Sequence, residues 1–155
     1  MIDADILDAI DIIAPQYELP LDLVKAICQV ESSWDRWAFR YEPGYKYLVG
    51  DKLRMTNTER FGQMCSWGLM QVMGGVAREY GYAGPFPALC QPRIGINFGC
   101  RHLHKFFVQY LTWPDAIAAY NAGSPLTLGS GGYINQAYVD KVHAARKSFE
   151  QDPEV

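Results

Sequence analysis

Glu31 is the residue whose type and position most clearly favour chemistry. It follows Val24 and Ile27 on the apolar face of a helix that is expected to begin near Leu21, and it lies near the C-terminal end of that helix. Burial raises the pKa of a carboxyl group, and the negative end of the helix macrodipole acts in the same direction. A carboxylic acid that stays protonated near neutral pH can act as the general acid that cleaves a glycosidic bond. The alternative is a structural Glu31 that bends towards solvent or pairs with an arginine such as Arg36.

The segment SWGLMQVM, residues 66–73, is a candidate binding surface. Gly68 permits close approach of the backbone, and the Gln71 amide can both donate to and accept from acetamido or hydroxyl groups. Met70 and Met73 add adaptable apolar surface. Taken alone, the segment also fits ordinary core and turn structure.

The segment AIAAYNAG, residues 116–123, is expected to form a closely packed helix because four of its residues are alanine. Tyr120 and Asn121 are its long polar side chains. A buried Tyr120 hydroxyl needs a hydrogen-bond partner, and a carboxyl group across a helix interface would serve. The alternative for Asn121, followed closely by Gly123, is an ordinary helix ending.

These segments occur in a specific order: ES at residues 31–32, GLMQ at 68–71 and AYNAG at 119–123. In that order they resemble the soluble lytic transglycosylases, and the goose-type lysozymes share a similar core. The resemblance covers about residues 20–142, and the region around Tyr138 is similar to the family's final helix. It implies cleavage of the β-1,4 bond between N-acetylmuramic acid and N-acetylglucosamine in peptidoglycan, with no cofactor.

The resemblance also implies roles for individual residues. Glu31 would protonate the glycosidic oxygen and then, as a base, take the proton of the C6 hydroxyl group, which closes a 1,6-anhydro ring. The 2-acetamido group of the substrate would stabilise the anomeric centre. Tyr120 matches the family tyrosine that contacts the catalytic acid. The positions expected to bind the glycan are Ser32, Ser66, Gly68, Met70, Gln71, Met73, Asn121 and Tyr138.

The spacing between the first two motifs departs from the family pattern. Residues 32–67, 36 in all, separate Glu31 from Gly68, which is more than many members have. We expect residues 34–66 to form an ordered insertion, with a helical turn or a small hairpin, that could cover the cleft. A second carboxylate from this insertion would permit hydrolysis instead, and the candidates are Glu42, Asp51 and Glu59. A hydrolytic muramidase, or a non-catalytic wall-binding or virion assembly module of the same fold, therefore remains an alternative.

A second departure is Gly95, which stands where the family usually has a structural asparagine. The surrounding sequence favours a mainly α, lysozyme-like fold, because apolar residues recur at helical spacing and no set of alternating strands is convincing. About six helices are expected, beginning near residues 5, 21, 70, 93, 113 and 135.

Length and composition set limits on the class of protein. With 155 residues, of which 49% are hydrophobic and 20% charged, the chain is expected to form one globular domain spanning residues 1–155. The net charge of −3 weighs against nucleic acid as the main partner. Peptidoglycan strands are the expected partner, and we expect a monomer.

The N-terminal segment, residues 1–16, lacks the basic start of a secretory signal, and no apolar run is long enough to cross a bilayer. We therefore expect a protein that is made in the cytoplasm. It would reach the wall after holin-type release as a phage endolysin, within a virion, or through a secretion apparatus.

The cysteine and histidine residues are expected to be structural. Free, buried thiols are the expected state of the cysteines because a core of this size needs no disulfides; the four are Cys28, Cys65, Cys90 and Cys100. Cys100, His102 and His104 alternate along a helix and so cannot point at one metal ion.

Overall fold

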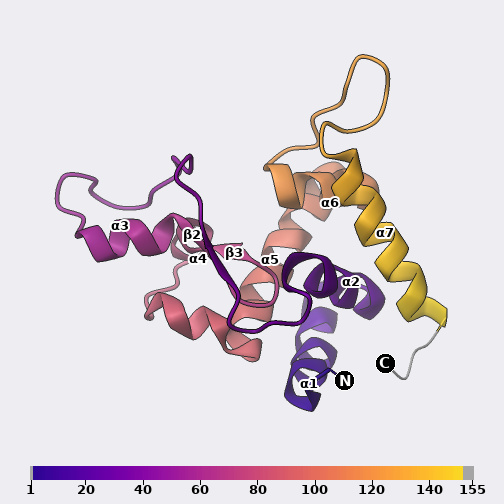
Figure 1. Cartoon of the computed structure of the whole chain (residues 1–155), viewed down its shortest axis with the longest axis horizontal. Coiled ribbons are helices and arrows are strands. Elements are labelled where there is room, and N and C mark those ends of the chain that lie inside the picture. The colour runs from indigo at the N-terminus through magenta and orange to yellow at the C-terminus, as the bar shows by residue number, and fades with distance from the viewer. Residues whose placement is uncertain (1, 152–155) are drawn as a thin grey trace.

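The computed structural model describes residues 2–151 and is mainly helical. This part of the chain has seven α-helices, two short 3₁₀ helices and three short strands. Figure 1 shows how the helices are arranged in space. The helices are α1 (Ala4–Ile13), α2 (Leu21–Ser32), α3 (Asn57–Gln63), α4 (Gly74–Glu79), α5 (Pro92–Tyr110), α6 (Trp113–Ala122) and α7 (Gln136–Gln151). The 3₁₀ helices are η1 (Ala14–Tyr17) and η2 (Phe86–Cys90), and the strands are β1 (Phe39–Tyr41), β2 (Cys65–Trp67) and β3 (Val72–Met73).

Helix α5 lies at the centre of the molecule. It packs against α1 and α6, and α2 packs against α7 (Figure 1). Residues of α1, α2, α5, α6 and α7 share one buried apolar cluster. The predicted mainly α, lysozyme-like fold is therefore confirmed.

Local sequence signals explain where α6 begins and ends. The Thr112 hydroxyl accepts a hydrogen bond from the backbone N–H of Asp115, which caps the first turn. Gly123 follows the last turn with a φ of +81°, a conformation that glycine adopts without strain. Both boundaries agree with the prediction from the sequence.

The helix that was predicted to begin near residue 70 begins later, as α4 at Gly74. Residues 72–73 form strand β3. Gly68 and Gln71 both have positive φ angles, +69° and +47°, so the backbone turns sharply between β2 and β3. The resulting antiparallel sheet has the order β1-β2-β3, a feature that the sequence pattern did not reveal.

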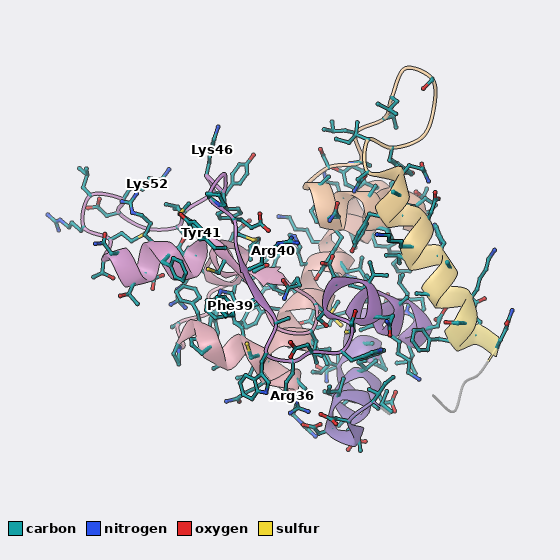
Figure 2. The ribbon with its side chains drawn as sticks, in the orientation of Figure 1. Arg36, Phe39, Arg40, Tyr41, Lys46 and Lys52 are labelled. Atoms are coloured by element: carbon teal, nitrogen blue, oxygen red, sulfur yellow. The ribbon has the colours of Figure 1, made fainter. Side chains whose placement is uncertain are left out.

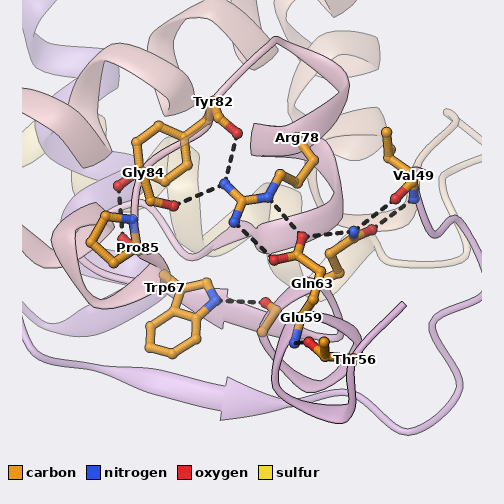
Figure 3. Close-up of polar contacts among 10 residues, drawn as sticks. Val49, Thr56, Glu59, Gln63, Trp67, Arg78, Tyr82, Gly84 and Pro85 are labelled. Atoms are coloured by element: carbon orange, nitrogen blue, oxygen red, sulfur yellow. Dashed lines mark hydrogen bonds and ion pairs between the residues drawn. The ribbon is translucent and has the colours of Figure 1, made fainter. Parts of the chain in front are cut away.

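The predicted insertion, residues 34–66, contains β1, α3 and the start of β2. A polar network holds α3 against α4 (Figure 3). The Arg78 guanidinium donates to both carboxylate oxygens of Glu59, at 2.8 and 3.0 Å, and the Gln63 amide bonds the backbone of Val49 through both of its polar atoms. The insertion is therefore fixed to the helical core.

Gly95 and Gly68 lie where the backbone of η2 comes very close. A Cβ atom added at Gly95 would lie 2.3 Å from the Leu89 carbonyl oxygen, and one added at Gly68 would lie 2.6 Å from the same oxygen. The Leu89 carbonyl thus occupies the space that a side chain would need at either position. The two glycines permit η2 to lie directly against both α5 and the turn before β3.

All four cysteines are buried and free. In residues 2–151 no helix combines the length and the apolar character needed to cross a membrane.

Candidate active site

Glu31 lies in the last turn of α2, on the face that was predicted from its spacing. Val24 and Ile27 on this face are fully buried, and Glu31 itself is partly buried. Its carboxylate Oε1 accepts a hydrogen bond of 2.6 Å from the hydroxyl of Tyr138 in α7. The packing of α2 against α7 brings together these two residues, which are 107 positions apart in the sequence.

Burial raises the pKa of the Glu31 carboxyl above its ordinary value of 4.5. The Tyr138 hydrogen bond and the positive charge of Arg40 both act in the opposite direction, because each favours the ionised carboxylate. Arg36 is not a partner of Glu31: its guanidinium binds Asp3 and Asp5 on the surface. The alternative of an ion pair between Glu31 and Arg36 is therefore not found, and Glu31 is partly buried instead of fully exposed.

Tyr120 lies near this carboxyl group but its hydroxyl has a different partner from the one we expected. It donates a hydrogen bond of 2.8 Å to the backbone carbonyl of Met70, not to a carboxylate. The Tyr120 ring packs against the His102 ring, with 5.5 Å between centroids. The hydroxyl that contacts Glu31 comes from Tyr138, which the sequence had suggested only as a residue bordering the cleft.

A cleft of about 750 Å³ opens beside Glu31. One wall comes from the insertion, and the other from α4, α5 and the end of α6. The lining residues are Glu31, Arg40, Glu42, Gly44, Tyr45, Tyr47, Ser66, Gln71, Met73, Val76, Glu79, His102, Lys105, Phe106, Gln109, Tyr120, Asn121, Ala122, Gly123 and Ser124. A cleft of this volume can hold a small number of sugar rings.

A family model with the description Transglycosylase SLT domain matches residues 8–129, which is most of the chain. The chain belongs to this family. A comparison with curated proteins found no match. Membership of the SLT family supports a peptidoglycan-cleaving function of the lytic transglycosylase type.

The predicted binding residues of this SLT domain fall into two groups. Ser66, Gln71, Met73 and Asn121 line the cleft, as does Tyr120. The other four positions do not line the cleft. The Ser32 hydroxyl donates to the carbonyls of Cys28 and Leu69, at 3.0 and 2.9 Å, Gly68 and Met70 are buried, and the Tyr138 hydroxyl bonds Glu31. The sequence motif therefore combines residues of the cleft with residues that shape the turn beneath it.

Gln71 is largely occupied by internal hydrogen bonds. Its Nε2 donates to the carbonyls of Ala38 and Gly68, and its Oε1 accepts from the Ser66 hydroxyl at 2.8 Å. The amide can thus offer a ligand only the remaining acceptor site on Oε1. We had expected a side chain free to bind acetamido groups, and the structure instead shows one that fixes the hairpin at the cleft.

Among the insertion carboxylates that were predicted as candidates, Glu42 lines the cleft. Its Oε1 accepts a hydrogen bond of 2.5 Å from Nε of Arg40. Glu59 is held by Arg78, and Asp51 bonds the backbone of Leu53 outside the cleft. Of the three, Glu42 alone is placed to meet a ligand of the SLT domain.

Several residues of the cleft walls were not predicted from the sequence. Arg40 and the tyrosines of the insertion lie in a segment without clear periodicity, so their orientation was not predictable. For His102 the sequence led only to the expectation that it is not a metal ligand. Its Nδ1 lies 2.9 Å from the Tyr80 hydroxyl, and burial lowers its pKa to about 4, which keeps the imidazole neutral at the cleft floor.

Proposed function

We propose that this SLT domain is a lytic transglycosylase that cleaves the β-1,4 bond between N-acetylmuramic acid and N-acetylglucosamine. It would leave 1,6-anhydromuramic ends and use Glu31 as its single acid and base. The observation that carries the proposal is the partly buried Glu31 carboxyl at the cleft, with its pKa raised by burial. Such a group keeps its proton to higher pH than an exposed glutamate does, and it can release that proton to a sugar oxygen.

In the first step, protonated Glu31 gives its proton to the glycosidic oxygen, and the bond from that oxygen to C1 breaks. The 2-acetamido group of the muramoyl residue stabilises the positive charge that develops at C1. The Tyr138 hydroxyl, 2.6 Å from Oε1, stabilises the carboxylate that Glu31 becomes.

In the second step, the Glu31 carboxylate takes the proton of the C6 hydroxyl group as O6 forms a bond to C1. This restores the acid, closes the 1,6-anhydro ring and consumes no water. One carboxyl group is therefore sufficient for the complete reaction.

One observation favours a second candidate, a hydrolytic muramidase. Glu42 places another carboxylate in the same cleft, and a carboxylate that activates water would yield a reducing end. Its ion pair with Arg40 engages one of its oxygen atoms, which favours the transglycosylase.

The test is digestion of purified peptidoglycan followed by mass spectrometry of the products. Anhydro ends are lighter than reducing ends by one water molecule, so the wild-type product mass separates the two candidates. Glu31→Gln should lower the rate of cleavage about 100- to 10,000-fold, the usual contribution of a general acid, while the fold is retained. Undiminished cleavage by this variant would refute the proposal.

Glu42→Gln is the matched control for the hydrolytic alternative. If Glu42 activates water, the variant loses reducing-end products. If the transglycosylase is correct, the variant still releases anhydro ends. A wall turbidity assay that shows no clearing by the wild-type protein would favour the non-catalytic wall-binding module.

A further inference from the structure

The cleft carries an ion pair that a neutral sugar polymer does not require. Arg40 and Glu42, both from the insertion, line the cleft and are joined through Nε and Oε1. A polymer of N-acetylglucosamine has no charge for either group to meet. Muramic acid differs by a lactyl ether at C3, whose carboxyl group is free in bare strands or is joined to a stem peptide that has carboxylates of its own.

Strand geometry directs the Arg40 side chain towards the cleft. Side chains alternate along β1, and Figure 2 shows Arg40 and Tyr41 on opposite sides of this segment. Arg40 pairs in register with Ser66 of β2, which also lines the cleft. Arg40 and Glu31 line the same cleft, so a sugar bound at Glu31 lies in the cleft that the guanidinium also lines. The positive charge of Arg40 also lowers the pKa of Glu31.

Hydrogen bonds hold the backbone on both sides of β1, whereas the Arg40 side chain extends into solvent and is paired with Glu42. The Ala38 carbonyl accepts a hydrogen bond of 2.8 Å from the Gly68 N–H, and the Glu42 N–H donates to the Met64 carbonyl at 2.8 Å. The Arg40 side chain is 70% exposed, and within residues 2–151 its two Nη atoms have no hydrogen-bond partner. The guanidinium therefore has free donors on a rigid support.

We propose that Arg40 binds a carboxylate on the C3 substituent of the muramoyl residue beside Glu31, and that Glu42 competes with the substrate for this guanidinium. The inference rests on the proposed function, because it assigns a substrate feature to the same cleft. Arginine suits the role because its planar donors match both oxygens of a carboxylate. Arg40 would thereby distinguish muramoyl strands from uncharged polymers of N-acetylglucosamine.

Because Glu42 competes for Arg40, the proposal predicts opposite effects of the two substitutions on substrate binding. Arg40→Gln removes the receptor for the carboxylate, so it should weaken binding of the substrate. Glu42→Gln removes the competitor and frees the guanidinium, so it should strengthen binding. If the ion pair were purely structural, both substitutions would change substrate binding in the same direction.

The experiment measures kcat and KM of wild type, Arg40→Gln and Glu42→Gln on three substrates. The first is bare glycan, made from peptidoglycan with an amidase that removes the stem peptides and leaves free lactyl carboxylates. The second is the same glycan with its carboxyl groups methyl-esterified, and the third is intact peptidoglycan. Arg40→Gln also removes a charge that acts on Glu31. This effect is the same on the bare glycan and on its methyl ester, so the ratio of the KM values on these two substrates isolates carboxylate binding.

We expect Arg40→Gln to raise KM about tenfold on a carboxylate substrate, as for the loss of one charge-assisted hydrogen bond, with little change on the ester. A selective loss on bare glycan identifies the lactyl carboxylate as the ligand, and a selective loss on intact peptidoglycan identifies a carboxylate of the stem peptide. Lys105→Gln is the matched control, because Lys105 is also a basic residue of the cleft, and it should not discriminate between acid and ester.

The inference fails if Arg40→Gln affects acid, ester and intact substrates equally, or if Glu42→Gln raises KM in parallel with it. Either result leaves the proposed function intact, since that depends on Glu31→Gln and on the mass of the wild-type products. Thermal unfolding of both variants checks that the fold is retained.

Discussion

Glu31 and Glu59 show how two glutamates of one chain acquire opposite tendencies to ionise. Burial raises the pKa of Glu31, and the Tyr138 hydroxyl donates a hydrogen bond to its carboxylate. The Arg78 guanidinium beside Glu59 holds the pKa of that carboxyl below its ordinary value. The first glutamate is therefore suited to carry a proton, and the second is suited to a permanent ion pair.

At the residue scale, Tyr138→Phe tests the hydrogen bond to Glu31. The hydroxyl favours the ionised carboxylate, so its removal should raise the pKa of Glu31 further. Because the first step needs the protonated acid, the alkaline limb of the pH–rate profile should move to higher pH. The measurement is kcat/KM on peptidoglycan against pH.

Tyr120→Phe is the matched control for this prediction. The Tyr120 hydroxyl donates to the Met70 carbonyl, so its removal should leave the alkaline limb in place. It should lower the free energy of unfolding by about 1 kcal/mol, the net value of one buried hydrogen bond. A shift of the limb in Tyr120→Phe but not in Tyr138→Phe would show that we have assigned the wrong tyrosine.

At the scale of elements, β1 separates two environments. Arg40 faces the cleft, whereas Phe39 stacks on Trp67 of β2 with 5.6 Å between ring centroids, and Trp67 in turn stacks on Phe86. These aromatic contacts join the sheet to η2, and the Arg78 network joins α3 to α4. The insertion is thus held at two places, which keeps its side of the cleft in position.

Arg78→Met should loosen the insertion while retaining apolar contact with the Phe86 ring, over which the guanidinium lies at 4.0 Å. The loss of a partly buried, charge-assisted pair leaves Glu59 without its arginine and should cost about 2 kcal/mol. Urea unfolding measures this cost, and limited proteolysis should show new cleavage within residues 34–66. Arg54→Met is the control, because its pair with Asp51 is exposed and should contribute little.

Gly95→Ala tests the close contact between η2 and α5. Within a helix this substitution normally stabilises, but here the added Cβ would lie 2.3 Å from the Leu89 carbonyl oxygen. We expect a loss of about 1–3 kcal/mol in thermal unfolding, as for other overpacked sites. Gly44→Ala should be near neutral, because no heavy atom lies within 4 Å of a Cβ at that position. A stabilised Gly95→Ala would contradict the packing described for η2.

At the scale of the whole molecule, the ionised form of Glu31 should reduce the stability of the fold. The pKa of Glu31 is higher in the folded chain than its ordinary value of 4.5. Ionisation of Glu31 therefore lowers the free energy of unfolding as pH rises from 4.5 through the folded-state pKa. Glu31→Gln removes this penalty and should raise the melting temperature at pH 7. The difference in melting temperature should vanish well below pH 4.5, where Glu31 is protonated in the folded and in the unfolded chain. An equal difference at all pH values would show that it does not come from the ionisation of Glu31.

The amino-acid sequence by itself determined the helical framework and the place of the acid. The shared face of Val24, Ile27 and Glu31 depends only on the geometry of α2, and the cap at Thr112 depends only on the first turn of α6. Such local features can be predicted from a short stretch of sequence. The order of the three short motifs indicated the family for the same reason, since each motif is a local pattern.

Tertiary structure alone decided which side chains meet. The choice of Tyr138 over Tyr120 as the partner of Glu31 depends on how α7 packs against α2, and no spacing along the chain encodes that contact. The short strands escaped detection because two or three residues show no usable period, and their pairing joins residues 26 positions apart, such as Arg40 and Ser66. Partners brought together over such distances are selected by the packing of the whole core, which acts on all elements at once.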